Sequence, residues 1–379
     1  MRREIVLVGM SGGVDSTVAA YLLQKQNFEV IGITMKIWSG NVSPNESLRS
    51  GCYGPGEIHD THDAEQTCKK LGIPHFVIDL SDEYGKTVMD NFSNEYKQGR
   101  TPNPCVVCNP IIKFGALLEK SKSLGIEYDR FATGHYARIF FSEADHRFYL
   151  KKGVDPKKDQ SYFLYRLNQT QLMQSLFPLG DYKKEQVKAI AYEIGFHAIA
   201  DKPESQDFID GGGYRSLFEK SKSQSGKILD MQGRILGNHQ GIYNFTIGQR
   251  KGVLNGGSSQ RMYVLRIDPL SNSIIVGPKE YLAVDQLIAV NVNWIAIDKL
   301  VSARNGTARL RSSQKESPCT LLPLDENHIE VRFKYPQYFA TPGQSIVFYQ
   351  DDIVIGGGII QSPHHIYDEK QFYEQTTGL

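Results

Sequence analysis

The segment that decides the fold is "EIVLVGMSGGVDSTVAAYLLQKQ", residues 4–26. Its apolar run "EIVLV" is typical of a buried strand, and "STVAAYLLQKQ" places apolar residues on one helical face. The glycine-rich stretch "GMSGGVDST" (9–17) joins them. Glycines let a backbone approach an anion closely, and the first turn of a helix offers free N–H groups and a positive dipole end. The segment therefore predicts a strand–loop–helix unit that binds phosphate; the alternative is a loop that serves only the turn.

The loop differs from the two common phosphate-binding motifs. No lysine follows Gly13, as Walker A would require, and the glycine spacing is not G-x-G-x-x-G. Phosphate binding would therefore depend on backbone amides, on the hydroxyls of Ser11 and Ser16, and on a metal ion held by Asp15.

The pattern of the rest of the chain predicts three parts. Up to about residue 200, strand-like segments at 29–35, 75–80 and 128–136 alternate with helix-like segments at 64–72 and 114–125, which favours a parallel sheet with crossover helices. After about residue 225, short alternating strands separated by turn signals predict a small β segment and then a β-barrel or sandwich. We expect domains at 1–210, 211–285 and 286–379.

Composition limits the class of protein. The 379 residues are too many for one hydrophobic core, and the net charge of +1 gives no general attraction for nucleic acid. No apolar run is long enough for a membrane helix or a signal peptide, so we expect no membrane partner. Five cysteines, an odd number without a secretion signal, favour free thiols in a reducing cytoplasm.

Two of these cysteines, Cys105 and Cys108, lie in "GRTPNPCVVCNP" (99–110). Such a C-x-x-C pair is compatible with half of a zinc site, an iron–sulfur site, a sulfur-handling dithiol or two core thiols. Zinc would need further ligands, for which the candidates are Cys52, His59, His62 and Cys68. Pro102 and Pro104 indicate a loop and argue against core thiols in a packed helix. Cys319 is expected to be buried in a strand of the last domain.

Several motifs together resemble one known family. "SGGVDS" is the signature of the PP-loop ATP pyrophosphatases, and six further segments resemble the tRNA-specific 2-thiouridylases. These are "GRTPNPCVVCNPIIKFG" (99–115), "ATGHYAR" (132–138), "KKDQSYFLYRL" (157–167), "KPESQD" (202–207), "GIYNFTIGQRKG" (241–252) and "ATPGQSIVFY…GGGII" (340–360). The resemblance implies an α/β fold: a Rossmann-like PP-loop domain of the adenine-nucleotide alpha-hydrolase type, a small β domain and a carboxyl-terminal β-barrel.

The resemblance also implies a reaction. With ATP and Mg²⁺, the enzyme would adenylate O2 of the wobble uridine (U34) of tRNAs with Lys-, Glu- or Gln-type anticodons and release pyrophosphate. A cysteine-bound persulfide, loaded by a sulfur-donor protein, would then displace AMP. Splitting one difficult step into two easier ones is the general logic of covalent catalysis.

The implied site residues follow by position. The nucleotide would meet Gly9, Met10, Ser11, Gly12, Gly13, Val14, Asp15, Ser16, Met35 and Gly134, with Asp15 also holding Mg²⁺. Asn103, Pro104 and Cys105 would contact the flipped-out uridine. For Met35 a plain core methionine remains an alternative, and His135 fits either the nucleotide site or a structural hydrogen bond.

One departure from the family concerns its cysteines. Cys108 falls on the catalytic cysteine, and Cys105 on a position often held by Asp. The second catalytic cysteine, normally in a "SQDICF"-like segment, is missing from "ESQDFIDGGGY" (204–214). We therefore hypothesise that Cys105 and Cys108 act as the sulfur-handling pair, with a thiolate favoured by nearby ATP·Mg²⁺. The alternative is a non-catalytic paralogue that binds tRNA or nucleotide; a PP-loop amidating ligase is a second rival.

Two basic clusters are candidates for RNA binding. "KKGVDPKKDQ" (151–160) has four lysines against two acids, and "RNGTARLRSSQK" (304–315) has four basic residues and no acid. Phosphate contacts come from such clusters, although a solvated strand face has the same composition. The resemblance implies tRNA contacts by Lys158, Asp159, Gln160, Arg309 and Arg311.

Overall fold

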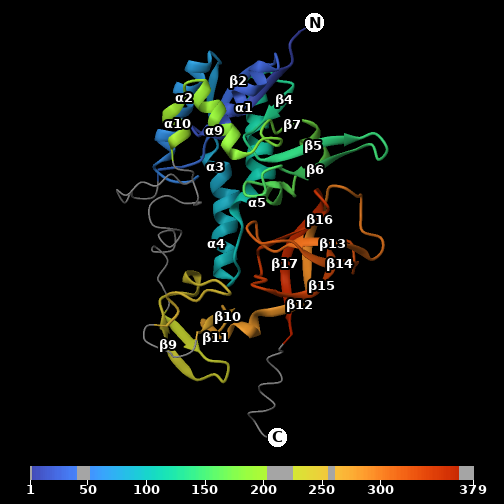
Figure 1. Ribbon diagram of the computed structural model, residues 1–379. Coiled ribbons are helices and arrows are strands. Elements are labelled where there is room, and N and C mark those ends of the chain that lie inside the picture. The colour runs from blue at the N-terminus through green and yellow to red at the C-terminus, as the bar shows by residue number, and fades with distance from the viewer. Residues whose placement is uncertain (1, 41–51, 203–224, 255–260, 367–379) are drawn as a thin grey trace.

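We describe a computed structural model of the chain, in which residues 2–40, 52–202, 225–254 and 261–366 are placed (Figure 1). The amino-terminal part is built on a five-stranded sheet in the order β3–β2–β1–β4–β7, in which all neighbouring strands are parallel. The strands are β1 (Ile5–Gly9), β2 (Glu29–Lys36), β3 (His75–Asp79), β4 (Arg130–Ala132) and β7 (Ser175–Leu176). The predicted parallel sheet is thus confirmed.

Helices cover both faces of this sheet. On one face, Val6 and Val8 of β1 pack against α1 (Val14–Lys25) and α2 (Glu57–Leu71). On the other, Leu7 packs toward a continuous helical run made of α5 (Pro104–Cys108), a π-helical stretch (Asn109–Ala116) and α6 (Leu117–Ser123). Alternate residues of a strand point to opposite faces, so a sheet covered on both sides needs this uninterrupted apolar run.

The remaining helices of this part are short, apart from one long run. That run consists of α3 (Ser81–Tyr84), a π-helical turn (Gly85–Met89) and α4 (Asp90–Lys97). The others are α7 (Ser161–Leu164), α8 (Gln169–Met173), α9 (Lys184–Glu193) and α10 (His197–Asp201). No helix in the described ranges is both long and apolar enough to cross a membrane.

The carboxyl-terminal part is a closed barrel, which decides between the barrel and the sandwich that the sequence allowed. Its strands run in the order β12–β15–β14–β13–β16–β17, and pairing of β12 with β17 closes the ring. They are β12 (Ala283–Trp294), β13 (Arg304–Arg309), β14 (Ser317–Pro323), β15 (His328–Tyr338), β16 (Ser345–Gln350) and β17 (Ile353–His365). Cys319 is buried in its core, as expected.

A four-stranded sheet, β10–β11–β8–β9, lies between these two parts in sequence. Its strands are β8 (Gly226–Leu229), β9 (Ile235–His239), β10 (Tyr263–Asp268) and β11 (Ser273–Gly277); short 3-10 turns occupy Ile242–Asn244 and Lys279–Leu282. It has a core of its own, centred on Val264, Ile274 and Val276. The predicted domain boundaries stay a prediction.

The hairpin of β5 (Ala137–Ser142) and β6 (Arg147–Lys152) was not expected, because the sequence pattern predicted only strands alternating with helices up to residue 200. It pairs with β17 and so extends the sheet of the barrel from within the amino-terminal part. One hydrophobic core accordingly contains Leu7 and Ile33 of the parallel sheet together with Val347 and Val354 of the barrel. The first and last parts therefore form one packed body.

The segment that follows α4 is held by both other parts. The backbone N–H of Thr101 donates to the carbonyl of Pro342 (2.9 Å), and Gln344 Nε2 donates to the carbonyls of Thr101 (3.0 Å) and Pro102 (2.9 Å). A Cβ on Gly99 would lie 2.9 Å from the Ile267 side chain of the middle sheet. Figure 1 shows α4 leading from the parallel sheet toward this junction. The chain leading into α5 and its two cysteines is thereby fixed by the barrel.

Candidate active site

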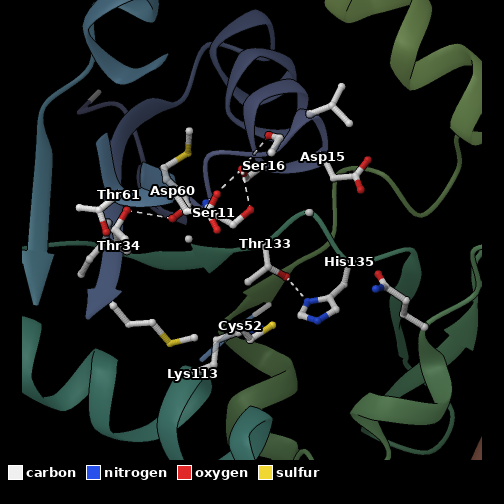
Figure 2. Close-up of a pocket in the computed structure, with 18 of the residues that line it drawn as sticks. Ser11, Asp15, Ser16, Thr34, Cys52, Asp60, Thr61, Lys113, Thr133 and His135 are labelled. Atoms are coloured by element: carbon white, nitrogen blue, oxygen red, sulfur yellow. Dashed lines mark hydrogen bonds between the residues drawn. The ribbon is translucent and has the colours of Figure 1, made fainter. Parts of the chain in front are cut away.

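A pocket of about 400 Å³ opens at the carboxyl ends of β1, β2 and β4 (Figure 2). This is the edge where ligands of open α/β sheets gather, and the volume is in the range of small-molecule sites. The predicted nucleotide residues that line it are Gly9, Met10, Ser11, Gly13, Val14, Asp15, Ser16, Met35 and Gly134. Their predicted role in binding a nucleotide stays a prediction, but the structure brings them together.

Gly12 is the predicted loop residue that does not line the pocket. It has φ of +70°, and a Cβ there would lie 2.5 Å from the backbone oxygen of Asp60 in α2. Gly12 therefore serves the tight turn and the packing of α2, both of which only glycine permits. The anion-facing part of the loop consists of its neighbours.

The loop itself is ordered by two serines. Ser16 Oγ donates to the carbonyl of Gly13 (3.1 Å) and accepts from the backbone N–H of Ser11 (3.2 Å), while the two serine hydroxyls lie 3.2 Å apart. Gly13 is the N-cap of α1, and no side chain caps the first turn. The free N–H groups at this helix start are what an anion would bind.

Gly134 closes the pocket from the β4 side. A Cβ at this position would lie 2.8 Å from the carbonyl carbon of Asp15 and 2.9 Å from the amide nitrogen of Ser16. The backbone after β4 therefore touches the first turn of α1 directly, and a larger residue would push the two apart.

Asp15 is engaged by two side chains that were not among the predicted site residues. Lys184 Nζ lies 2.8 Å from both carboxylate oxygens, and Tyr136 OH donates to one of them (2.7 Å). Lys184 begins α9 and is buried. The cation that Walker A would place in the loop thus comes from a helix about 170 residues away, which no local motif could reveal.

Four lysines line the pocket: Lys113, Lys158, Lys184 and Lys202. Lys202 Nζ also contacts Asp60 (2.7 Å) and Asp63 (2.9 Å) of α2. Converging ammonium groups in a concave site raise the local concentration of an anionic ligand. The lining is therefore suited to a polyphosphate.

His135 is half-buried, with its Nδ1 2.7 Å from Thr133 Oγ1 and its ring in contact with those of Phe114 and Phe177. Burial, with a contribution from the charge of Lys113, holds the pKa of His135 well below its usual value. The ring is therefore neutral at physiological pH. It lines the pocket and also makes a structural hydrogen bond, so both readings of this residue remain open.

The two cysteines of the C-x-x-C segment lie on α5, so the expectation of a loop was wrong. Pro104 occupies the first turn, where a proline needs no hydrogen-bond donor, and Asn103 Oδ1 accepts from the backbone N–H of Val106 (3.4 Å) as the N-cap. Cys108 is buried and Cys105 is half-buried.

Burial raises the pKa of the Cys105 thiol to about 12 and that of Cys108 to about 11, while the charge of Lys113 acts in the opposite direction on both. The expected lowering of these pKa values is therefore absent from the protein alone. Lys113 is the group that favours the thiolates, and it also lines the pocket, so it connects α5 with the loop site.

Of the residues considered as zinc ligands, Cys68 lies in a different place from the other thiols. Its sulfur packs beneath β2, where a Cβ on Gly32 would lie 2.5 Å from it. Across the placed residues, no group of three or more potential ligands is arranged to hold a metal ion. Cys52, by contrast, is exposed and lines the pocket.

The predicted RNA-contacting residues divide into two sets. Lys158 and Gln160 line the pocket, and Gln160 Oε1 accepts from the backbone N–H of Tyr136 (3.0 Å). Asp159 instead pairs with Arg309 of the barrel (2.7 Å), whose other nitrogen contacts Glu316 (2.9 Å).

The other residues that were predicted to contact RNA also make contacts within the chain. Arg311 donates to Thr341 Oγ1 (3.0 Å). Asn103 and Pro104 cap and begin α5, as described above. Contacts of all these residues with RNA stay a prediction, and the "ESQDFIDGGGY" segment lies outside the described residues.

Comparison with known proteins covers nearly the whole chain. Family models match residues 4–209 (tRNA methyl transferase HUP domain), 216–278 (tRNA methyl transferase PRC-barrel domain) and 284–360 (aminomethyltransferase beta-barrel domain). The tRNA-specific 2-thiouridylase MnmA 1 of Caldanaerobacter subterraneus is 48% identical over 94% of this chain and 97% of that protein. The chain belongs to the tRNA-specific 2-thiouridylase family.

Other members of the 2-thiouridylase family agree. The MnmA protein of Endomicrobium trichonymphae is 46% identical over 94% of this chain and 98% of its own length, and that of Acetivibrio thermocellus is 43% identical over 95% and 100%. A solved 4-thiouridine synthetase–RNA complex with bound ATP is similar at 16% identity over 57% of this chain and 49% of that one, with a TM-score of 0.33, which is too low to carry an argument. The family and the fold class expected from the sequence are confirmed.

Proposed function

We propose that the protein catalyses ATP-dependent 2-thiolation of uridine 34 in tRNA. The observation that carries the proposal is that the helical run bearing the two thiols continues into Lys113, which lines a pocket with four lysines, in a chain 48% identical to a named 2-thiouridylase. Lys113 belongs to both, because it lines the pocket and its charge acts on both thiols. This supports a nucleotide step and a sulfur step at neighbouring positions.

The loop and its lysines would bind the triphosphate of ATP. The uncapped N–H groups of α1 and the hydroxyl of Ser11 would donate to phosphate oxygens, and Lys184 would supply positive charge. Met35 and Gly134 would line the rest of the nucleotide, as the end of β2 and the turn after β4 place them beside the loop.

Asp15 would hold Mg²⁺, whose charge would neutralise the phosphates of ATP. A single carboxylate combined with phosphate oxygens is a common magnesium donor set, so the residue fits this role. Lys184 now contacts both oxygens of Asp15, so the ion and the ammonium group would compete for the carboxylate.

The reaction would proceed in two displacements. The O2 atom of uridine attacks the α-phosphorus of ATP, forming an adenylated uridine and releasing pyrophosphate. A persulfide sulfur then attacks C2, and the C2–O bond breaks as AMP leaves with that oxygen. A urea-like carbonyl oxygen is a poor leaving group until it carries a phosphate, which is why ATP is consumed.

Cys108 is the thiol placed at the family's catalytic position, and Cys105 is its nearest partner in sequence. Because burial raises the pKa of both, an activating charge is needed, and Lys113 supplies it. Asn103, Pro104 and Cys105 would meet the flipped-out base. Lys158, Asp159, Gln160, Arg309 and Arg311 would belong to the surface that holds the tRNA, and a separate sulfur-donor protein would load the persulfide.

The test is thiolation of an unmodified tRNA transcript with anticodon UUU by the purified protein, loaded with sodium polysulfide and supplied with ATP and Mg²⁺. Thiolated tRNA is scored by its retardation on a mercury-containing gel, and pyrophosphate release is measured in the same samples. We expect both products with the wild type and loss of thiolation with Cys108→Ser, while Cys319→Ala in the barrel core should leave both unchanged. Tight tRNA binding without pyrophosphate release would instead identify a non-catalytic paralogue.

A further inference from the structure

Tyr84 of α3 is buried in a hydrophobic core that also contains Cys108 and Tyr53, the residue next to Cys52. Burial raises the pKa of the Tyr84 hydroxyl, and negative charge on Cys108, Cys52 or Cys105 raises it further. Charge on Cys52 also raises the pKa of both Cys105 and Cys108. The packing agrees with these effects, because Tyr53 stacks on Tyr84 and because Cys52 lines the same pocket as Lys113, which lies five residues after Cys108. Cys52 therefore belongs to the same cluster as the C-x-x-C pair, although more than fifty residues separate them in sequence.

Packing fixes Cys52 in this place. The adjacent Tyr53 is buried and stacks on Tyr84, with ring centroids 5.6 Å apart and an interplanar angle of 13°. Glu57, at the start of α2, accepts hydrogen bonds from the backbone N–H groups of Ile37 (2.6 Å) and Trp38 (3.0 Å), just after β2. The chain that directly follows Cys52 is thus tied to the pocket edge of the sheet.

The three thiols differ in access. Cys52 is exposed and lines the nucleotide pocket, together with Lys113 (Figure 2). Cys108 is buried, Cys105 is half-buried, and neither lines the pocket. A sulfur carrier has to meet a donor from outside and then a substrate within the site. Cys52 is the thiol of the cluster that satisfies both requirements.

We propose that Cys52 carries the persulfide and that Cys108 is the thiol that resolves it, an assignment that rests on the proposed thiolation of tRNA. The terminal sulfur of Cys52–S–SH, losing its proton, attacks C2 of the adenylated uridine, and AMP leaves. The Cys108 thiolate then attacks the Cys52 sulfur of the resulting C2–S–S–Cys52 linkage. The S–S bond breaks, its electron pair stays on the sulfur at C2, and a Cys52–Cys108 disulfide forms. A thiol reductant restores the two thiols for the next turnover.

A single-turnover experiment tests this assignment. The protein is loaded with sodium polysulfide, desalted, and mixed with ATP, Mg²⁺ and the unmodified transcript in the absence of reductant. Pyrophosphate, thiolated tRNA and disulfide-linked peptides are then measured in parallel for the wild type, Cys52→Ala and the control Cys319→Ala. Thermal unfolding of each variant accompanies the assay, and the exposure of Cys52 makes its replacement compatible with folding.

We expect wild type and Cys319→Ala to thiolate tRNA and to yield the Cys52–Cys108 peptide. Cys52→Ala should still release pyrophosphate but lose thiolation to the background level. Full thiolation by Cys52→Ala, or a Cys105–Cys108 disulfide in the wild type, would overturn the assignment while leaving the proposed function intact. A wild type that produces neither pyrophosphate nor thiolated tRNA would overturn the proposed function itself.

Discussion

Gly134 is the residue at which the predicted site is most sensitive to a single atom. A Cβ there would meet backbone atoms of Asp15 and Ser16, which cannot rotate away as a flexible side chain could. We predict that Gly134→Ala costs about 1–3 kcal/mol of stability, as overpacking does, and weakens ATP binding by displacing the loop. Urea unfolding and the ATP dependence of pyrophosphate release would measure the two effects.

The matched control is Gly85→Ala, because nothing lies within 4 Å of a Cβ at Gly85 and its backbone is helical. That variant should be neutral or slightly stabilised and keep its dependence on ATP. Equal behaviour of the two variants would contradict the close approach that the structure shows.

The thiols allow a prediction of pH dependence. Because burial raises the pKa of Cys108 to about 11, only about one molecule in 10³ carries its thiolate at pH 8. Alkylation of Cys108 by iodoacetamide should therefore rise about tenfold per pH unit from pH 7 to 10, whereas a free cysteine, with a pKa of about 8.5, levels off earlier. Peptide-resolved mass spectrometry gives the rates.

Replacement of Lys113 by methionine should slow this alkylation further. The positive charge of Lys113 partly offsets the effect of burial, so its loss should raise the pKa of Cys108 still more. If the alkylation rate of Cys108 in the wild type reached a plateau below pH 9, the prediction that burial raises its pKa would be contradicted.

At this scale the sequence located the loop residues, Met35 and Gly134 but not the groups that complete the site. Glycine and serine in a strand–helix turn are a local signal, which a motif records. Lys184 and Cys52 reach the pocket only through the packing of α9 and of the chain after β2. The ends of the strands do predict where the site lies. Cys52 lies in the connection after β2, so its position was a signal for the site that the sequence analysis did not use.

At the scale of the elements, the start of α5 depends on one residue, Asn103, to which two roles are assigned. Asn103 caps the helix, and it was also predicted to contact the uridine. Asn103→Ala should lose about 1 kcal/mol of stability with the cap, whereas Asn103→Asp keeps a capping oxygen and should stay within a few tenths of the wild type. Urea unfolding would separate them.

If Asn103 also contacts the base through its amide, Asn103→Asp should lose thiolation despite its stability. Normal thiolation by the aspartate variant would leave capping as the residue's contribution.

The sequence placed β1, β2 and β3 within about a residue of their bounds, because buried parallel strands carry strong apolar runs. It missed the β5–β6 hairpin and the helix α5 for different reasons. The hairpin is stabilised by β17, some 200 residues later, so its neighbours in sequence do not reveal it. The prolines before α5 were interpreted as loop signals, although proline is favoured in the first turn of a helix.

At the scale of the whole molecule, the Asp159–Arg309 ion pair links the amino-terminal part to the barrel, and we expect the stability of the protein to depend on it. The side chain of Asp159 is 2% exposed and that of Arg309 14%. Asp159→Asn would leave the buried Arg309 with Glu316 as its remaining carboxylate partner among the described contacts, so it should cost about 3 kcal/mol, the low end for breaking a buried pair. The control Arg2→Met breaks the exposed pair with Asp129 and should cost less than about 1 kcal/mol.

Urea unfolding of both variants would test this. A loss of similar size in each would mean that the barrel and the parallel sheet are held together elsewhere. Lys152 and Tyr349, which pack at the same junction, would then be the next pair to examine.

The sharing of one sheet between β6 and β17 has a consequence for synthesis on the ribosome. The hairpin leaves the exit tunnel with an unpaired edge, and its partner strand is made only when about 200 further residues have been translated. An open strand edge is a template for wrong pairing, and long-range pairing of this kind is slow. The nascent chain must therefore keep that edge available, so a version of this protein cut before the barrel would be prone to aggregate rather than survive as a smaller enzyme.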